Sequence, residues 1–329
     1  MTRTARLKAY AKLNLGLKVL YRRSDGYHEL RTVFQTISLA DRLAISFERN
    51  RSLRIELDEV PEIPDNLALK AATLLSEALN IRGHIRIQLH KRIPAGAGLG
   101  GGSSDAAAVL LALPVLSGRR VDTGELSQLG AALGSDVPFF LYGGAALGIG
   151  RGEELYPLPD HPAADGVVVV PNIHSSTAEA YRVLSGNLTS IGLQNKLAGF
   201  QQEIWQVIGS AQAAHGGATA RVATAAGQGN DFEEVVFARF PELRRIKTRL
   251  IRSGAGPVGM TGSGSAIFGI FADPERSAVL LNRTEQLFPE AKVFKISFLS
   301  RAQYRSGWLR ALQDHTQGNQ WPPRSRYAR

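Results

Sequence analysis

Alternating apolar and polar residues predict a strand-rich start to the chain. Side chains alternate in this way over residues 6–19, and strand-like stretches also cover residues 32–38, 42–48, 52–57 and 84–90. A turn is expected at residues 23–26. One helical pattern interrupts the strands at residues 67–79, behind Asp65, which we expect to be its N-cap. The first ninety residues therefore predict several strands and one helix.

A helical pattern follows the glycine-rich segment at residues 94–104. We expect Ser103, Ser104 and Asp105 to cap a helix that runs through an alanine- and leucine-rich stretch to Pro114. Asp122 should cap a second helix that ends at Gly134, and residues 135–138 should open a third, with proline at an early helical position.

The second half of the chain mixes strands and helices. A valine run at residues 166–171 predicts a buried strand, and we place a domain boundary there. Residues 185–230 are small and polar, with one helical stretch at 200–208, and are expected to be an insertion. Residues 231–253 are expected to be helical and 266–271 to be a strand. The pattern predicts an α+β fold with two domains, at residues 1–165 and 166–300, followed by a basic tail at 301–329.

The composition excludes several classes of protein. With 329 residues and 44% hydrophobic residues, the chain can bury a substantial core. It has no cysteine, which excludes disulfides, a thiolate nucleophile and Cys-ligated zinc, and its seven histidines show no metal-ligand spacing. No metal-ligating residues are therefore predicted, and any bound metal is expected to be Mg²⁺. No apolar run is long enough to span a membrane and no signal peptide is visible, so we expect a cytoplasmic protein that does not contact a membrane.

The formal net charge of +10 raises the hypothesis that the protein binds nucleic acid. Half of that excess lies after residue 300, where six arginines stand against one acidic residue. We expect this segment to be a solvated, partly disordered tail, and keep a nucleic-acid-binding module that acts through it as an alternative function.

The glycine-rich segment is expected to bind phosphate. Its five glycines lie between residues 96 and 102, so the backbone can adopt positive φ and point consecutive N–H groups at one anion. The following helix adds the positive end of its dipole, and Ser103 and Ser104 add hydroxyl donors. A flexible linker is the alternative, although linkers rarely stand between an apolar strand and a capped helix.

Other phosphate-binding motifs do not fit this segment. Gly96, Gly98 and Gly101 match GxGxxG, and Asp122 follows at the distance of a dinucleotide site. Asp122, however, begins a helix, whereas that acid should end a strand. No Gly-Lys pair occurs, so a Walker A loop is excluded, and the protein-kinase triplets HRD and DFG are absent. A nicotinamide-dependent oxidoreductase is therefore only a minor alternative.

Two glycine motifs resemble those of the GHMP small-molecule kinases: PAGAGLGGGSSDA at residues 94–106 and GMTGSGSAIFGIF at 259–271. The sequence most resembles the family members that phosphorylate a cytidine diphosphate ester of methylerythritol in non-mevalonate isoprenoid synthesis. It is carried by AYAKLNLGLKV, RRSDGYHELRTVFQTISLAD, DNL and LGSDVPFFLYGGAALGIGRGE. The resemblance covers residues 5–184, then 230–232 and on to about residue 300. It implies a two-domain α+β fold, with ATP and the substrate meeting in the cleft between the domains.

Lys12 and Asp136 match the family's catalytic pair. A lysine within an apolar strand is costly unless an acid or a phosphate pairs with it. Asp136 would accept the proton of the substrate hydroxyl or fix that hydroxyl, while Lys12 keeps the carboxylate ionised. The structural alternatives are an edge lysine that extends to solvent, and an aspartate that serves only as a helix N-cap.

The resemblance also implies the binding residues. The substrate contacts are Asn14, Tyr27, His28, Phe34, Tyr181, Gly262, Ser263 and Gly264. Aromatic rings can stack on a pyrimidine, and groups at Tyr27 and His28 can bond its polar edge. As alternatives, Phe34 is a core residue, His28 a turn residue, and the segment at Gly262 a plain turn.

ATP is the expected cofactor, with Mg²⁺. The expected contacts are Asn66, Lys91 and the loop residues Pro94, Ala95, Gly96, Ala97, Gly98, Leu99, Gly100, Gly101, Gly102, Ser103 and Ser104. Asp105 could face a ribose or cap the helix. Homoserine or mevalonate kinase activity is the nearest alternative function, and we expect a monomer or a weak homodimer that does not bind nucleic acid.

Overall fold

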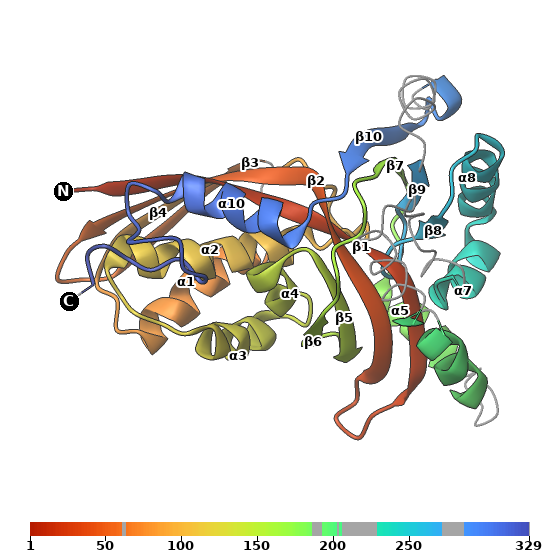
Figure 1. Ribbon diagram of the computed structural model, residues 1–329, viewed down its shortest axis with the longest axis horizontal. Helices are drawn as coiled ribbons and strands as arrows, with labels where there is room; N and C mark the ends of the chain where they lie inside the picture. The colour runs from red at the N-terminus through yellow and green to blue at the C-terminus, as the bar shows by residue number, and fades with distance from the viewer. Residues whose placement is uncertain (61–63, 186–192, 203, 206–228, 272–285, 329) are drawn as a thin grey trace, which may run out of the picture.

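The computed structural model describes residues 1–60, 64–185, 193–202, 204–205, 229–271 and 286–328 (Figure 1). Of the expected helical stretch at 200–208, residues 200–202 and 204–205 are described and are helical, whereas most of the rest of the expected insertion lies outside the described residues. Within the described ranges the chain builds a six-stranded and a four-stranded sheet, and helices pack against each. This agrees with the α+β fold predicted from the sequence.

The six-stranded sheet comes from the first half of the chain. Its strands are β1 (Arg3–Arg22), β2 (His28–Arg49), β3 (Arg54–Val60), β4 (Gly83–His90), β5 (Ala145–Gly150) and β6 (Glu154–Pro157). The order is β3-β4-β2-β5-β6, and β1 pairs with β2. Neighbours are antiparallel, except that β3 runs parallel to β4.

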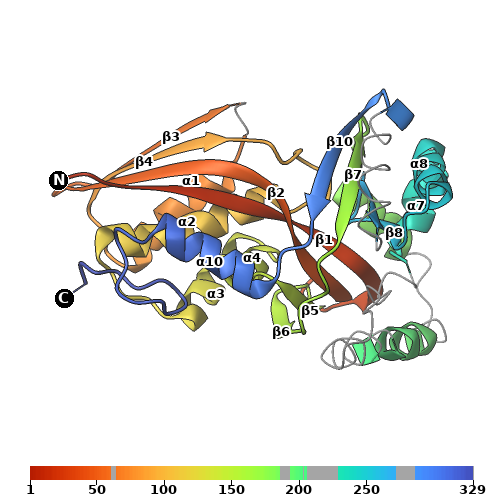
Figure 2. The same ribbon diagram turned by 45° about the horizontal axis from the view of Figure 1, so that its top comes forward.

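Four helices lie on one side of this sheet (Figure 2). They are α1 (Leu67–Ala78), α2 (Gly101–Ser117), α3 (Thr123–Leu133) and α4 (Val137–Tyr142). Every residue of α2 from 104 to 116 is buried, as expected for a helix that is apolar on all sides. Because α2 begins directly after the glycine loop, this buried helix holds the loop in a fixed place. No helix in the described ranges is long and apolar enough to cross a membrane.

The four-stranded sheet has the order β10-β7-β9-β8. Its strands are β7 (Asp165–Pro171), β8 (Val258–Met260), β9 (Ile267–Phe271) and β10 (Ala291–Ser297), and its helices are α5 (Thr177–Ser185), α7 (Phe232–Arg239) and α8 (Pro241–Arg252). The long β1–β2 hairpin reaches from the first sheet into this half (Figure 1). There Leu17, Val19 and Leu30 join the same buried cluster as Val167 and Phe232. One hairpin therefore belongs to both halves.

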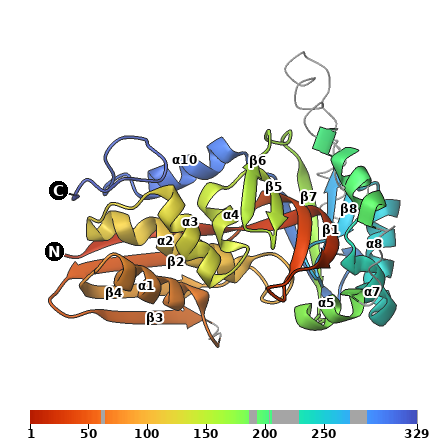
Figure 3. The ribbon, with the colours of Figure 1, turned by 90° about the horizontal axis from the view of Figure 1, so that it is seen from below.

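The C-terminal tail is folded, which corrects our expectation of a partly disordered segment. Residues Arg301–Ala311 form α10, beside β1 and α4 (Figure 3). Tyr304, Trp308 and Leu312 are buried in the core of the first half. They recur every fourth residue, so they form one apolar stripe of a helix. This spacing was overlooked because the arginines between these residues dominate the composition.

Helix beginnings differ in detail from the sequence predictions. The N-cap of α1 is Asn66, whose side chain accepts a hydrogen bond from Ala68 N, and not Asp65. The N-cap of α2 is Gly100, in the left-handed region with φ of 71°, and no side chain caps this helix. The cap at Asp122 is confirmed, because its carboxylate accepts from Glu125 N at 2.8 Å. The predicted helix at 231–253 is two helices, which are separated at Phe240.

The buried stripe on α10 gives a stability prediction. Trp308 is 2% exposed, so Trp308→Ala should lower the free energy of unfolding by about 3–5 kcal/mol through lost burial and the cavity left behind. The exposed Arg310 lies on the other side of the same helix, and Arg310→Ala should change stability by only about 0.5 kcal/mol. Urea unfolding followed by circular dichroism measures both, and equal midpoints for the two variants would contradict a docked tail.

Candidate active site

Lys12 is a buried cation at an irregular point of β1. The pairing of β1 with β2 shifts register between Tyr10 and Lys12, and again between Asn14 and Gly16. Such bulges re-aim side chains out of the regular alternation. Lys12 is 3% exposed, and its amine donates to Asn14 Oδ1 at 2.5 Å. The edge-lysine alternative is therefore wrong, because this ammonium lies inside the protein.

Asp136 is the acidic partner of that cation. Its Oδ2 lies 3.4 Å from Lys12 Nζ, and its side chain is 32% exposed. It stands just before α4, at the N-cap position, yet its carboxylate makes no capping hydrogen bond. The alternative that Asp136 serves only as a helix cap is therefore wrong. The structure brings together two residues that lie far apart in the sequence.

The two glycine segments lie against each other beside this pair. Gly98 has φ of 78°, and a Cβ at this position would lie 2.1 Å from the carbonyl oxygen of Thr261. A Cβ at Gly262 would lie 3.0 Å from Gly98 Cα. Only glycine permits this approach. The first loop is also joined to β1, because Lys12 N donates to Leu99 O at 3.0 Å.

Thr261 ties these segments together, and the sequence analysis did not single it out. Its Oγ1 accepts from Asn14 N at 3.0 Å and lies 3.1 Å from Gly98 O, to which it can donate. Asn14 in turn donates from Nδ2 to Thr32 Oγ1 at 2.8 Å. The only sequence signal for Thr261 was its place within the second glycine motif.

A cleft of about 920 Å³ opens between the two halves in front of this constellation. Thirteen of the predicted site residues line it: Lys12, Asn14, Tyr27, His28, Phe34, Gly96, Gly98, Gly100, Ser103, Asp136, Tyr181, Gly262 and Ser263. It is also lined by cationic or titratable residues that we had not predicted, namely Arg22, Arg151, His174 and Arg182. The site therefore lies between the domains, as the resemblance implied.

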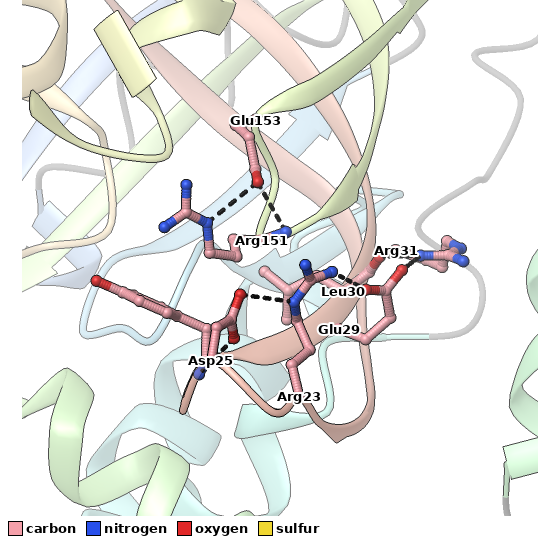
Figure 4. Close-up of polar contacts among 8 residues, drawn as sticks. Arg23, Asp25, Glu29, Leu30, Arg31, Arg151 and Glu153 are labelled. Carbon is pink, nitrogen blue, oxygen red and sulfur yellow. Dashed lines mark hydrogen bonds and ion pairs between the residues drawn. The ribbon is translucent and has the colours of Figure 1, made fainter. Parts of the chain in front are cut away.

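Ion pairs fix the tip of the β1–β2 hairpin at the rim of this cleft (Figure 4). The Arg23 guanidinium lies between Asp25, at 3.1 Å, and Glu29, at 2.6 Å. Asp25 Oδ1 accepts from Tyr27 N at 3.0 Å, and this hydrogen bond lowers the pKa of Asp25. The Arg151 guanidinium lies 4.7 Å from the centre of the Tyr27 ring. The turn thus presents Tyr27, whose side chain is exposed, in one orientation.

Aromatic rings form one wall of the cleft. The His28 ring stacks on the Tyr181 ring at 4.8 Å, and Phe232 meets Tyr181 edge-on. His28 Nε2 is 2.6 Å from Ser185 Oγ. Burial, and secondarily the charge of Arg22, lower the pKa of His28, so its imidazole is neutral at pH 7. Burial, and secondarily the charge of Asp136, raise the pKa of Tyr181.

Phe34 is both a core residue and a residue of the cleft, the two roles that we considered from the sequence. It is 2% exposed and packs on Phe139 of α4, with 4.9 Å between ring centres. Its ring also lies 5.6 Å from Lys12 Nζ and lines the cleft. It is therefore a core residue whose edge reaches the site.

A second pocket of about 370 Å³ lies along the glycine loop. Asn66, Lys91 and residues 94–103 line it. Two predicted residues, Ser104 and Gly264, line neither cavity. Ser104 is 1% exposed, and its hydroxyl has no hydrogen-bond partner among the described residues.

Lys91 is held between two buried acids. Its amine lies 2.5 Å from Asp41 Oδ2 and 2.5 Å from Asp105 Oδ2. Asp41 also accepts from Ile93 N at 2.8 Å, so it anchors the strand end that leads into the glycine loop. Asp105 therefore faces Lys91 and does not cap the helix. Asp41 was not predicted, because its partners are distant in the sequence.

This cluster holds two carboxylates and one ammonium away from water. Burial and the charge of Asp41 outweigh the opposing effect of Lys91 and raise the pKa of Asp105 to about 7. Near neutral pH the cluster therefore takes up and releases a proton directly beneath the loop.

Comparison with known proteins identifies related chains. The family models for the N-terminal and C-terminal domains of GHMP kinases match residues 66–144 and 210–289. A protein from Solibacter usitatus named 4-diphosphocytidyl-2-C-methyl-D-erythritol kinase is 54% identical, over 99% of this chain and 98% of its own. One of the same name from Moorella thermoacetica is 44% identical, over 87% of this chain and 97% of its own.

A solved structure shows the same arrangement. The crystal structure of a 4-(cytidine 5'-diphospho)-2C-methyl-D-erythritol kinase aligns with a TM-score of 0.70 at 37% identity, and covers 91% of this chain and 99% of that chain. The two-domain fold expected from the sequence is thereby confirmed.

The buried acid cluster gives a pH prediction. An unfolded aspartate releases its proton near pH 3.8, whereas Asp105 in the folded protein holds its proton until about pH 7. Between these values the folded state binds more protons, so this group lowers the unfolding free energy as pH rises. Asp105→Asn should remove that loss, which is on the order of 3 kcal/mol between about pH 4.5 and about pH 7.5.

Urea unfolding at the two pH values measures this difference. Asp41→Asn is the control, because it would place an amide donor against the Lys91 ammonium and should destabilise the protein at both pH values. Equal pH dependence in the parent protein and Asp105→Asn would show that Asp105 does not titrate in this range.

Proposed function

The chain belongs to the GHMP kinase family, and from this we propose that it transfers a phosphoryl group from ATP to the 2-hydroxyl of 4-diphosphocytidyl-2-C-methyl-D-erythritol, in non-mevalonate isoprenoid synthesis. The relatives matched over nearly the whole chain carry the name of this kinase. The observation that supports it most directly is the contact between Lys12 and Asp136, in a cleft bordered by two glycine loops.

In the proposed mechanism Asp136 acts on the acceptor hydroxyl. A bond forms between the hydroxyl oxygen and the γ-phosphorus of ATP, the bond from that phosphorus to the leaving ADP oxygen breaks, and the hydroxyl proton passes to the carboxylate. Lys12 keeps the carboxylate ionised and stabilises negative charge that develops on the acceptor oxygen. Phosphoryl transfer depends mainly on positioning and electrostatics, which a buried ion pair provides.

We assign the nucleotide to the first glycine loop. Its backbone N–H groups and the N-terminal end of α2 would contact the phosphates, and residues 95–103 supply these groups. Asn66 and Lys91 line the adjoining pocket and are proposed to border the nucleotide. Because the Lys91 amine is already paired with two acids, its proposed role is to hold the loop rather than to donate its charge.

Mg²⁺ is proposed to enter with ATP. No group of three or more histidine or acidic residues among the described residues could form a metal cage. This fits Mg²⁺, which is commonly held by nucleotide phosphates, water and one or two protein oxygens, and here Asp136 and Ser103 line the cleft with suitable oxygens. The ion would neutralise phosphate charge.

We assign the cytidine end of the substrate to the aromatic wall. Tyr27, His28, Phe34 and Tyr181 line the cleft, and a neutral imidazole can either donate to or accept from a pyrimidine edge. Asn14 would bind the acceptor end, beside Lys12, and Gly262 and Ser263 would bind the diphosphate. An amino acid or a hydroxy acid has no aromatic ring that could stack on this wall, which argues against a homoserine or mevalonate substrate.

A coupled assay of ADP release tests the function. The purified protein should release ADP with MgATP and the cytidyl ester, and not with homoserine or mevalonate. ADP at the rate of the substrate-free blank with the cytidyl ester would refute the proposal.

Asp136→Asn should lower kcat by about 10²-fold or more, because the amide cannot accept the proton, while KM for ATP changes little. Asp122→Asn is the matched control: it makes the same change at an aspartate that does cap its helix, where asparagine caps equally well. An unchanged kcat in Asp136→Asn would exclude Asp136 from the chemical step.

Tyr181→Leu should raise KM for the cytidyl ester by about 10-fold, through loss of an aromatic face worth about 1–3 kcal/mol, with KM for ATP unchanged. Tyr156→Leu, at an exposed tyrosine outside the cleft, is the control. If both Tyr181→Leu and its control leave KM for the ester unchanged, the cytidine does not bind at the aromatic wall.

A further inference from the structure

The C-terminal end of α4 is held by side chains from the tail. The last carbonyls of a helix have no partner within it. In α4 the Phe139 carbonyl accepts from Gly143 N at 3.0 Å. The Phe140 carbonyl accepts from the Tyr304 hydroxyl, and the Leu141 carbonyl accepts from Trp321 Nε1 at 3.0 Å. Two residues of the tail thus donate to two of the last carbonyls of this helix.

The contact continues just beyond α4. Arg301 Nε donates to Gly143 O at 3.2 Å. A Cβ at Gly143 would lie 2.3 Å from the Tyr304 ring, and one at Gly144 would lie 2.7 Å from Arg301 Cβ. Both glycines have positive φ, of 66° and 76°. The two glycines after α4 therefore permit a close contact with the tail that a side chain at either position would prevent.

The opposite end of α4 carries the proposed catalytic acid. Asp136 immediately precedes this six-residue helix, so about 6 Å of helix axis separates it from the carbonyl that Tyr304 binds. The same helix carries Phe139, which packs on Phe34 at the cleft. A helix this short cannot bend internally, and a shift at its C-terminal end therefore moves Asp136 relative to Lys12.

We propose that two residues of the tail, Tyr304 and Trp321, are positioning residues: they fix α4 and thereby hold the Asp136 carboxylate against Lys12. Neither residue lines the cleft. The proposal rests on the function proposed above only in that Asp136 acts on the acceptor hydroxyl.

The tail also supplies its own control. Tyr327 contacts His315 and Asp314 within the tail and lies under the Arg3 guanidinium, but none of its contacts is with α4. Tyr327→Phe and Tyr304→Phe therefore make the same chemical change on the same segment, and only Tyr304→Phe removes a donor to α4.

The kinetic test compares Tyr304→Phe, Trp321→Phe and their combination with Tyr327→Phe. The combined variant should lower kcat by about 10-fold, the scale of a sub-ångström misplacement, with KM for both substrates within about twofold. On an Asp136→Asn background the same two changes should lower kcat no further, because the group that they position is gone. A purely stabilising tail would give the same fold-loss on both backgrounds, and that result would overturn the proposal.

A second measurement does not depend on activity. Hydrogen exchange of the amides of residues 137–143 should be faster in Tyr304→Phe and in Trp321→Phe, and unchanged in Tyr327→Phe. Trp321 is only partly buried, so Trp321→Phe remains informative if Tyr304→Phe does not fold. Unchanged exchange in every tail variant would overturn the positioning role, whereas an inactive parent protein with faster exchange in the variants would refute the proposed function alone.

Discussion

The buried ammonium of Lys12 is the constraint on which the site depends. A charged residue that is 3% exposed within a strand is tolerated only if other groups replace the interactions that its charge would make with water. Asn14 supplies a hydrogen bond, and Asp136 supplies the opposite charge at 3.4 Å. Asp136 stands at the start of α4, whereas Lys12 lies on β1 and its backbone bonds the glycine loop, so compensating Lys12 requires the sheet, the loop and α4 to pack together. The geometry that a phosphoryl transfer needs is the same geometry that makes this buried charge tolerable.

Close contact between backbones gives the rest of the cleft its form. Gly98 meets Thr261 at a separation that no side chain would permit, and Thr261 also accepts a hydrogen bond from Asn14. The N–H groups of two loops from different domains can therefore face one volume. The β1–β2 hairpin, which contributes to the cores of both halves, holds the domains in register across it.

Support for the site extends well beyond its lining. Beneath the first loop, Asp41 and Asp105 hold Lys91, and the raised pKa of Asp105 makes this support sensitive to pH. At the far end of α4, two side chains of the tail donate to carbonyls of the helix that Asp136 precedes. In both places buried polar groups that have partners fix the position of elements that themselves touch the cleft.

The sequence by itself determined the features that depend on neighbouring residues. Apolar periodicity located most strands and helices, glycine content located the phosphate loop, and two motifs in order indicated the family and, with it, Lys12 and Asp136. Only the tertiary structure decided which distant residues meet. Asp41 beneath the loop, Thr261 against Gly98 and Tyr304 against α4 could not be found by local patterns, because each acts through a partner at least fifty residues away. The tail shows the reason most clearly: its arginines suggested a solvated segment, whereas burial of a stripe of three apolar side chains against a surface built by the first half decided its fold.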